Sequence, residues 1–196
     1  MSLLEALTSS AFAMSDCSRS VLQLISQDQC QAIASYKQFE YTEVNYFLRN
    51  GKWHSEDKSE MLNSLITGVS KLPAFRGTVY RGTSFENSLK LFRDYTTVGN
   101  TVYDRAFAST SESRSIAESF ITDSGESRFV LMIIRSRTGR NIQGIGASGI
   151  DLSEKEILFL PSTKFKITKV KKIKVTNPEF GLDNANVHEV YMDEIL

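Results

Sequence analysis

The segment Glu154-Lys155-Glu156-Ile157-Leu158-Phe159-Leu160-Pro161 places a pair of carboxylates directly before an apolar run. A short apolar run of this kind is typical of a buried strand. On an extended strand, residues i and i+2 point to the same face, so Glu154 and Glu156 are expected to address one site. A Glu-x-Glu triplet alone is a weak signal, because it also arises by chance in charged strands. Its meaning depends on the segments that precede it.

Two further apolar segments upstream end in polar residues, namely Val79-Tyr80-Arg81-Gly82-Thr83-Ser84 and Ala106-Phe107-Ala108-Ser109-Thr110-Ser111. A strand-end arginine such as Arg81 commonly forms a surface salt bridge, and its other use is bidentate recognition of phosphate. Gly82 would let a ligand approach the backbone closely. Ser109 and Ser111 would share one strand face, either as polar residues of an edge strand or as functional groups.

The length of 196 residues predicts one domain, 1–196, with a helical part at 1–72 and a β-rich core at 73–196. Apolar residues recur at helical spacing in the first part, and Asn50-Gly51 is typical of a helix C-terminus. A helix is also expected at 112–120, with Ser111 or Ser113 as its N-cap. The candidate strands are 78–81, 105–110, 128–135, 156–160, 164–175 and 187–192. Helices first and strands later, without regular alternation, predict an α+β fold.

The charge pattern excludes several classes of partner. Lys+Arg and Asp+Glu are equal at 23 each, which does not suggest a polyanionic partner. In the segment 164–174 lysines alternate with apolar residues, which predicts a half-exposed strand with a solvated lysine face, so no nucleic acid is expected.

No apolar run approaches the roughly 20 residues of a membrane span. No Lys or Arg precedes Ala11-Phe12-Ala13, so a Sec signal peptide is not expected.

The cysteines and histidines narrow the possible chemistry. Cys17 and Cys30 match no metal spacing and are expected to be free thiols. The chain has only two histidines, His54 and His188, which lie far apart in the sequence. This disfavours Ser-His and Cys-His hydrolases. Carboxylates remain as the groups that could act as acid, base or electrostatic stabiliser. No metal is expected. The glycines of 144–149 have dinucleotide-binding spacing but precede a strand instead of a helix, so they predict no Rossmann fingerprint.

Taken with its helix, the second segment reads Phe107-x-Ser109-Thr110-Ser111-x5-Ala117-x2-Phe120, a much rarer string than the triplet alone. An arginine, a Ser-Thr-Ser triplet and a Glu-x-Glu, in this order, resemble the signature of the arginine-specific mono-ADP-ribosyltransferases. The helical residues Tyr36, Tyr41 and Asn45 are similar to the N-terminal block of that family. The resemblance implies an ADP-ribosyltransferase fold, with the helical part on a core of two packed, mostly antiparallel sheets and an NAD cleft.

The resemblance also implies a function for each matched residue. Arg81 would bind the NAD phosphates and the Gly82 backbone the nicotinamide carboxamide. Ser109 would hold Glu156 by a hydrogen bond, Glu156 would bind the 2′-hydroxyl of the nicotinamide ribose, and Glu154 would meet the target guanidinium. The other cofactor-binding residues are Phe120, which would stack on the nicotinamide, together with Thr110, Ser111, Tyr36, Tyr41 and Asn45. In some relatives an arginine that helps to bind phosphate lies three residues after the stacking phenylalanine. In this chain that position is Asp123, so Arg128 or another group would have to bind the phosphate instead.

By this resemblance the chain would transfer ADP-ribose from NAD, its co-substrate, to an arginine of a target protein. It would be a bacterial toxin or effector, secreted or injected by a route other than Sec and active in the cytosol of a target cell, or the toxin domain of a longer protein. An immunity protein or delivery machinery would be further partners. One alternative is an NAD glycohydrolase on the same fold, and another is an inactive binding module. Intact Arg81, Ser109, Glu154 and Glu156 count against the inactive module.

Overall fold

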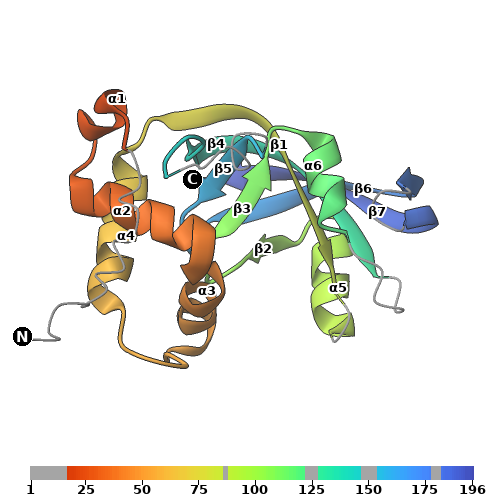
Figure 1. Cartoon of the computed structure of the whole chain (residues 1–196). Coiled ribbons are helices and arrows are strands. Elements are labelled where there is room, and N and C mark those ends of the chain that lie inside the picture. Colours follow the sequence, from red (N-terminus) through yellow and green to blue (C-terminus); the bar gives the residue numbers. More distant parts are fainter. Residues whose placement is uncertain (1–16, 86–87, 122–127, 147–153, 178–181) are drawn as a thin grey trace, which may run out of the picture.

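The computed structural model describes residues 17–85, 88–121, 128–146, 154–177 and 182–196. The helices are α1 (Arg19–Leu22), α2 (Gln27–Ser35), the π-helix η1 (Tyr36–Glu40), α3 (Tyr41–Asn50), α4 (Ser59–Lys71), α5 (Leu89–Thr96) and α6 (Arg114–Ser119). The strands are β1 (Ala74–Ser84), β2 (Thr101–Tyr103), β3 (Ala108–Ser111), β4 (Phe129–Asn141), β5 (Glu156–Phe159), β6 (Lys164–Asn177) and β7 (Leu182–Ile195). Figure 1 shows helices α1 to α4 together on one side of the strands.

Local sequence explains how the N-terminal helices begin and end. The Ser26 side chain accepts a hydrogen bond from the Gln29 N–H, and the Gln29 side chain accepts one from the Ser26 N–H, which is a capping box at the start of α2. The helix α3 ends at Gly51, whose φ of 75° lies in the left-handed region that glycine tolerates. The expected end at Asn50-Gly51 is therefore confirmed. Between them, η1 joins α2 to α3 without a break.

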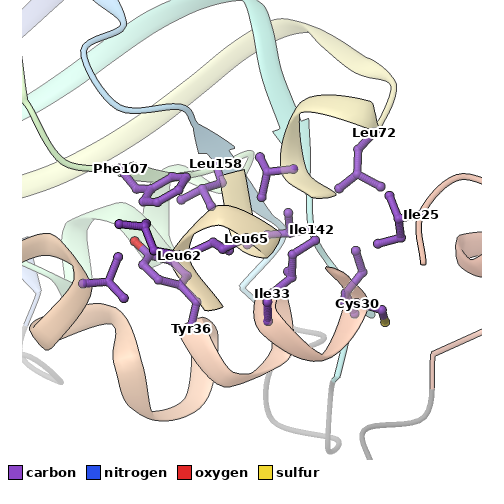
Figure 2. Packing of buried hydrophobic residues seen from close by; sticks show 14 residues of the cluster. Ile25, Cys30, Ile33, Tyr36, Leu62, Leu65, Leu72, Phe107, Ile142 and Leu158 are labelled. Atoms are coloured by element: carbon purple, nitrogen blue, oxygen red, sulfur yellow. The ribbon is translucent and has the colours of Figure 1, made fainter. Parts of the chain in front are cut away.

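One hydrophobic cluster joins the helices to the β-rich part. Ile33 of α2 and Leu65 of α4 are fully buried, and they pack in the same cluster as Phe107, Ile142 and Leu158. Figure 2 shows these side chains within one extended cluster between the helices and the strands. Burial of large apolar side chains is the main favourable contribution to folding. The helical part is therefore held to the strands by a shared core.

The strands form a continuous sheet with the order β1-β3-β5-β4-β7-β6-β2, and β1 also pairs with β4. Strands β1, β3, β5 and β4 thus form a closed ring of pairings, while β7, β6 and β2 extend from β4. All strand pairs are antiparallel except β4 and β7, which run parallel. The α+β class and the mostly antiparallel pairing are confirmed, and the two expected sheets are joined by hydrogen bonds through β4.

The strand β4 is buried on both faces, because its alternate side chains enter different clusters. Val130, Met132 and Ile134 pack with residues of β6 and β7, whereas Phe129 and Leu131 pack with residues of α6. This explains why β4 has an almost continuous apolar sequence at its start. The helix α6 is positioned by this second cluster.

The structure also differs from the expected elements. The strand expected at 105–110 begins only at Ala108, and the strands around 78–81 and 187–192 extend further in both directions. The short elements α5 and β2 were not expected. The helix α5 begins where the Ser88 side chain accepts a hydrogen bond from the Leu91 N–H, and β2 depends on pairing with residues 164–166 of β6. The lysine-bearing face of β6 is exposed, as expected.

The expectation of two free thiols is wrong, because Cys17 and Cys30 form a disulfide. Cys30 is fully buried within the helical cluster, and Cys17 packs against that cluster from the segment before α1. The sequence spacing could not indicate this pairing, since it depends on the way α1 folds back onto α2. The bond ties the first described residue of the chain to the helical core.

Candidate functional site

A cavity of about 440 Å³ opens between the helical part, the ring strands β1 and β3, and α6. Eleven of the site residues expected from the sequence line it: Tyr36, Tyr41, Asn45, Arg81, Gly82, Ser109, Thr110, Ser111, Phe120, Glu154 and Glu156. Five additional residues complete the wall: Lys37, Tyr80, Phe107, Ile116 and Ala117. A cavity of this size, with aromatic walls and a few convergent polar groups, is typical of a small-molecule site.

The Ser-Thr-Ser triplet lies on β3, where it pairs with β5. The Ser109 hydroxyl donates a hydrogen bond of 2.6 Å to Oε1 of Glu156. The Thr110 hydroxyl donates to the carbonyl of Ile157 at 2.6 Å, and the Ser111 hydroxyl donates to the carbonyl of Glu154 at 2.6 Å. Thus Ser109 orients a carboxylate, while Thr110 and Ser111 fix the backbone of the segment that carries both carboxylates.

The reason for the convergence of Glu154 and Glu156 differs from the one expected. The strand β5 begins at Glu156, so Glu154 lies before it in a bend, and Lys155 between them has a φ of 48°. The shared face of an extended strand therefore does not explain why both side chains line the cavity. Their convergence is explained by the left-handed backbone at Lys155 and by the hydrogen bond from the Ser111 hydroxyl to the Glu154 carbonyl. Glu156 is buried, with 8% of its surface exposed, whereas Glu154 is half-buried.

Arg81 lies on β1, and its Nη1 donates a hydrogen bond of 2.6 Å to the carbonyl of Ser109. Burial lowers the pKa of the Arg81 guanidinium, and the negative charge of Asp104 partly offsets this effect. Asp104 in turn accepts hydrogen bonds from Nε and Nη2 of Arg49, at 2.9 and 2.6 Å. Arginine stays protonated in proteins despite such shifts. The cavity wall therefore presents a cation that is held in place by the strand neighbouring its own.

Gly82 is needed here for the packing of α6. A Cβ atom at this position would lie 1.9 Å from the carbonyl oxygen of Ala117, which is far inside contact distance. The absence of a side chain lets the backbone of α6 rest directly on β1. The sequence predicted close approach of a ligand to this glycine, whereas in the structure the backbone of α6 makes the close approach.

The helical wall of the cavity is fixed by a small polar network. Nδ2 of Asn45 donates to the Tyr36 hydroxyl at 3.1 Å, and the backbone N–H of Phe107 donates to Oδ1 of Asn45 at 3.2 Å. The rings of Tyr36 and Phe107 lie 5.1 Å apart. Burial raises the pKa of the Tyr36 phenol, and the negative charge of Glu156 adds to this effect. Tyr36 therefore stays neutral and acts as part of the cavity wall.

Phe120 and Tyr41 lie at the rim of the cavity with large exposed areas. Phe120 follows the last residue of α6 and is 58% exposed, and Tyr41 begins α3 and is 53% exposed. Single exposed aromatic side chains are common on protein surfaces, but both of these also line the cavity. Both rings are thus available to stack on a planar ligand group.

Two further residues differ from the expected site. Lys37 was not among the expected site residues, but it lines the cavity and donates from Nζ to the carbonyl of Ile142 at 3.4 Å. Its position next to Tyr36 and one helical turn before Tyr41 was the available signal. Arg128, expected as a substitute phosphate ligand, is not part of the cavity wall and donates to the carbonyl of Phe85 at 3.4 Å. Asp123 lies outside the described residues.

Neither a metal-binding cluster nor a membrane-spanning helix is found in the described part of the chain. No group of three or more His, Cys, Asp or Glu side chains there is arranged to hold a metal ion. None of the helices described is both long and apolar enough to cross a bilayer.

Comparison with known proteins gives consistent matches over most of the chain. The sequence is 29% identical over 161 residues to the Mav protein of Mycobacterium avium (strain 104), covering 82% of this chain and 18% of that protein. It is 28% identical over 145 residues to Tre1 of Serratia proteamaculans (strain 568), named an NAD(+)--protein-arginine ADP-ribosyltransferase, covering 74% of this chain and 29% of Tre1. The chain thus spans less than a third of the length of these two relatives.

Solved structures with the same fold include the ADP-ribosyltransferase Vis in complex with an inhibitor, with a TM-score of 0.69 and 20% identity over 94% of this chain and 78% of that one. Exoenzyme S from Pseudomonas aeruginosa, bound to carba-NAD and human 14-3-3 protein beta, has a TM-score of 0.64 and 17% identity over 87% of this chain and 75% of that one. The fold is therefore that of the ADP-ribosyltransferase toxins. The family model for the ADP-ribosyltransferase exoenzymes matches residues 10–189, and the chain belongs to that family.

Proposed function

We propose that this chain transfers ADP-ribose from NAD to the guanidinium of an arginine in a target protein. The observation that carries the proposal is the Ser109–Glu156 hydrogen bond of 2.6 Å, which orients a buried carboxylate in a cavity that Arg81 and Glu154 also line. Membership of the exoenzyme family and the activity for which Tre1 is named support the same reaction.

The residues of the cavity fit NAD as a co-substrate. The guanidinium of Arg81 matches the geometry of a diphosphate better than an ammonium would. The exposed ring of Phe120 would stack on the nicotinamide, and the backbone of Gly82 would meet its carboxamide. Tyr36, Tyr41 and Asn45 would form the helical wall, and the volume of about 440 Å³ lies within the usual range for ligand sites.

The first chemical step would break the bond between nicotinamide and C1′ of the ribose. The electron pair leaves with nicotinamide, and the ribosyl carbon gains positive charge, as in glycoside cleavage. The Glu156 carboxylate would hold the ribose 2′-hydroxyl and stabilise this charge, because a fixed carboxylate in a buried site interacts strongly with a nearby cation. The Ser109 hydrogen bond keeps that carboxylate from rotating away.

The second step would join a guanidinium nitrogen of the target arginine to C1′. That nitrogen loses a proton as the new bond forms, and Glu154 would accept it. Glu154 is half-buried and therefore accessible to a side chain that enters from solvent. Its backbone is fixed by the Ser111 hydroxyl, so its carboxylate is presented from a defined position.

Paired variants test whether Glu156 stabilises the ribosyl cation while Glu154 serves only the arginine acceptor. Glu156→Gln should abolish both protein labelling and nicotinamide release, because each passes through the ribosyl cation. Glu154→Gln should lose labelling of arginine but retain much of the hydrolysis of NAD by water. Glu60→Gln, at an exposed position on α4, is the matched control. Full labelling by Glu156→Gln would refute the proposed reaction. Equal loss of both activities in Glu154→Gln would refute separate functions for Glu154 and Glu156.

The biological setting follows from the same proposal. As a member of an exoenzyme family, the chain would act as a bacterial toxin or effector that is secreted or injected and modifies a protein in the cytosol of a target cell. An immunity protein in the producing cell and a delivery apparatus would be its further partners. The shared core of Ile33, Leu65 and Phe107 supports the view that residues 1–196 work as one domain.

A further inference from the structure

The helix α6 has three faces with different surroundings. Ile116 and Phe120, four residues apart and therefore on one side of the helix, line the cavity. Ala117 also borders the cavity, and it is buried in the cluster that joins α6 to β4 and β7. Arg114 and Glu118 form an ion pair on a further side, with 2.8 Å between Nε and Oε1. Since residues two apart in a helix point in roughly opposite directions, Arg114 lies opposite Ile116.

A buried carboxylate of β7 holds this outer side of α6. Nη1 of Arg114 donates a hydrogen bond of 2.7 Å to Oε1 of Glu189. Glu189 is only 5% exposed, and its other oxygen, Oε2, accepts a hydrogen bond from the Tyr191 hydroxyl at 2.7 Å. Although burial acts to raise the pKa of the Glu189 carboxyl, the hydrogen bonds from Tyr191 and Arg114 hold it below its usual range. Glu189 is therefore ionised at neutral pH and offers a fixed negative charge to α6.

The sheet fixes the position of Glu189. The strand β7 pairs with β4 on one side and with β6 on the other, where Leu131 and Lys171 are directly opposite Glu189. The ring of Tyr191, which holds Oε2, lies 5.4 Å from Nζ of Lys169 and 5.4 Å from Nζ of Lys171. A cation at this distance is attracted to the face of an aromatic ring. The carboxylate is thus a rigid anchor within the sheet.

The anchor complements the contact between α6 and β1. The close packing of Ala117 on Gly82 sets the distance between the helix and the strand. A single close contact leaves the helix free to rotate about its own axis, whereas a second attachment on another face prevents that rotation. Rotation of α6 would move the ring of Phe120 at the cavity rim. The hydrogen bond from Arg114 to Glu189 is the attachment that opposes it.

We propose that Glu189 is a positioning residue for the nicotinamide end of the cofactor site, acting through Arg114 and α6 on Phe120. Neither Glu189 nor Arg114 is among the described residues that line the cavity, so the effect on the cofactor is indirect. The contact of Phe120 with nicotinamide rests on the proposed function, whereas the ion pair does not. The diphosphate end, assigned to Arg81 on β1, should not depend on Glu189.

Titration calorimetry with two ligands tests the proposal. Carba-NAD, the analogue bound in the Exoenzyme S structure, carries a nicotinamide, whereas ADP-ribose does not. For Arg114→Met we expect the Kd for carba-NAD to rise about threefold to tenfold, in line with the loss of an aromatic stacking contact. The Kd for ADP-ribose should change less than about twofold. Arg135→Met is the matched control, because Arg135 also pairs with a carboxylate of β7, Asp193 at 3.5 Å, and lies outside the cavity wall.

Double variants separate this pathway from general destabilisation. Glu189→Gln preserves the size of the side chain and removes its charge, so it should also weaken carba-NAD binding. Arg114→Met should cost less affinity in the Glu189→Gln background than in the parent protein, because the ion pair is already lost. It should likewise cost less in Phe120→Ala, where the positioned ring is absent. Independent, multiplicative losses in either double variant would overturn the proposal, as would equal weakening of carba-NAD and ADP-ribose.

Hydrogen exchange gives a readout that needs no ligand. The amides of Phe120 and Ile121 donate to the carbonyls of Ala117 and Glu118 at the end of α6. They should exchange faster in Arg114→Met than in the parent protein, while the amides of β5 should not. Unchanged exchange would overturn the proposal, as would an unchanged Kd for carba-NAD. If the parent protein binds neither ligand, the proposed function fails, and the exchange result alone then supports or overturns the positioning contact.

Discussion

The Ser109 hydroxyl reaches Oε1 of Glu156 diagonally across the β3–β5 pair, since Ser109 is directly opposite Leu158 and Glu156 is directly opposite Ser111. Diagonal neighbours on one face of an antiparallel pair lie within reach of each other. The register of two strands, set by their apolar residues, therefore decides which serine serves the carboxylate.

Replacing Ser109 with alanine should lower the rate of nicotinamide release by roughly tenfold to a hundredfold, because hydrogen bonds to charged groups contribute about 1.5–3 kcal/mol. The KM for NAD should change much less, because the hydroxyl contacts Glu156 and most of the contacts proposed for NAD involve other residues. Steady-state kinetics of Ser109→Ala, with Ser115→Ala on α6 as control, check this. An unaltered kcat would show that Glu156 is oriented without Ser109.

Arg81→Lys should weaken NAD binding by about 1–3 kcal/mol, because a point charge cannot replace a planar donor fork at a diphosphate. The variant also loses the Nη1 contact to the Ser109 carbonyl. Titration calorimetry on the folded variant measures the affinity. Arg76→Lys, an exposed position on the same strand, is the matched control. Equal affinities for both variants would remove Arg81 from the cofactor site.

Phe120→Ala should leave the melting temperature nearly unchanged, because a residue that is 58% exposed contributes little to the core. A buried phenylalanine would instead cost roughly 3–5 kcal/mol. Its NAD affinity should fall by about 0.5–1.5 kcal/mol, the range measured for aromatic stacking. Tyr103→Ala on β2, 49% exposed and outside the cavity, should change neither quantity. A large drop in melting temperature with normal affinity would contradict a stacking function.

Removal of the disulfide through Cys17→Ser should lower the free energy of unfolding by about 3 kcal/mol, the value that loop-closure entropy gives for a loop of this size. The two cysteines are separated by 13 residues in the sequence. A reducing agent should lower the melting temperature of the parent protein and leave that of Cys17→Ser unchanged. Thermal melts of both proteins, with and without reductant, provide the measurement. Identical parent melts in the two conditions would contradict a stabilising disulfide.

The elements whose signals are local could be predicted from the sequence. The order of helices before strands, the helix end at Gly51 and the exposed lysine face of β6 follow from periodicity and turn chemistry within short windows. The three polar segments around Arg81, Ser109 and Glu156 were likewise visible, because each interrupts or borders an apolar run. These signals sufficed for the α+β class, whereas the set of candidate site residues came from the resemblance to the arginine-specific mono-ADP-ribosyltransferases.

The arrangement of those residues depends on contacts between distant parts of the chain. The burial of Gly82 under α6, the disulfide of Cys17 with Cys30 and the hydrogen bond from the Ser111 hydroxyl to the Glu154 carbonyl each join parts of the chain that no short window contains. Side-chain direction at such places is set by strand register and by packing between distant elements, because the free energy of burial depends on the whole core and not on neighbours in sequence. The sequence could name the groups that meet at the cavity, but their distances and their partners arise from that packing.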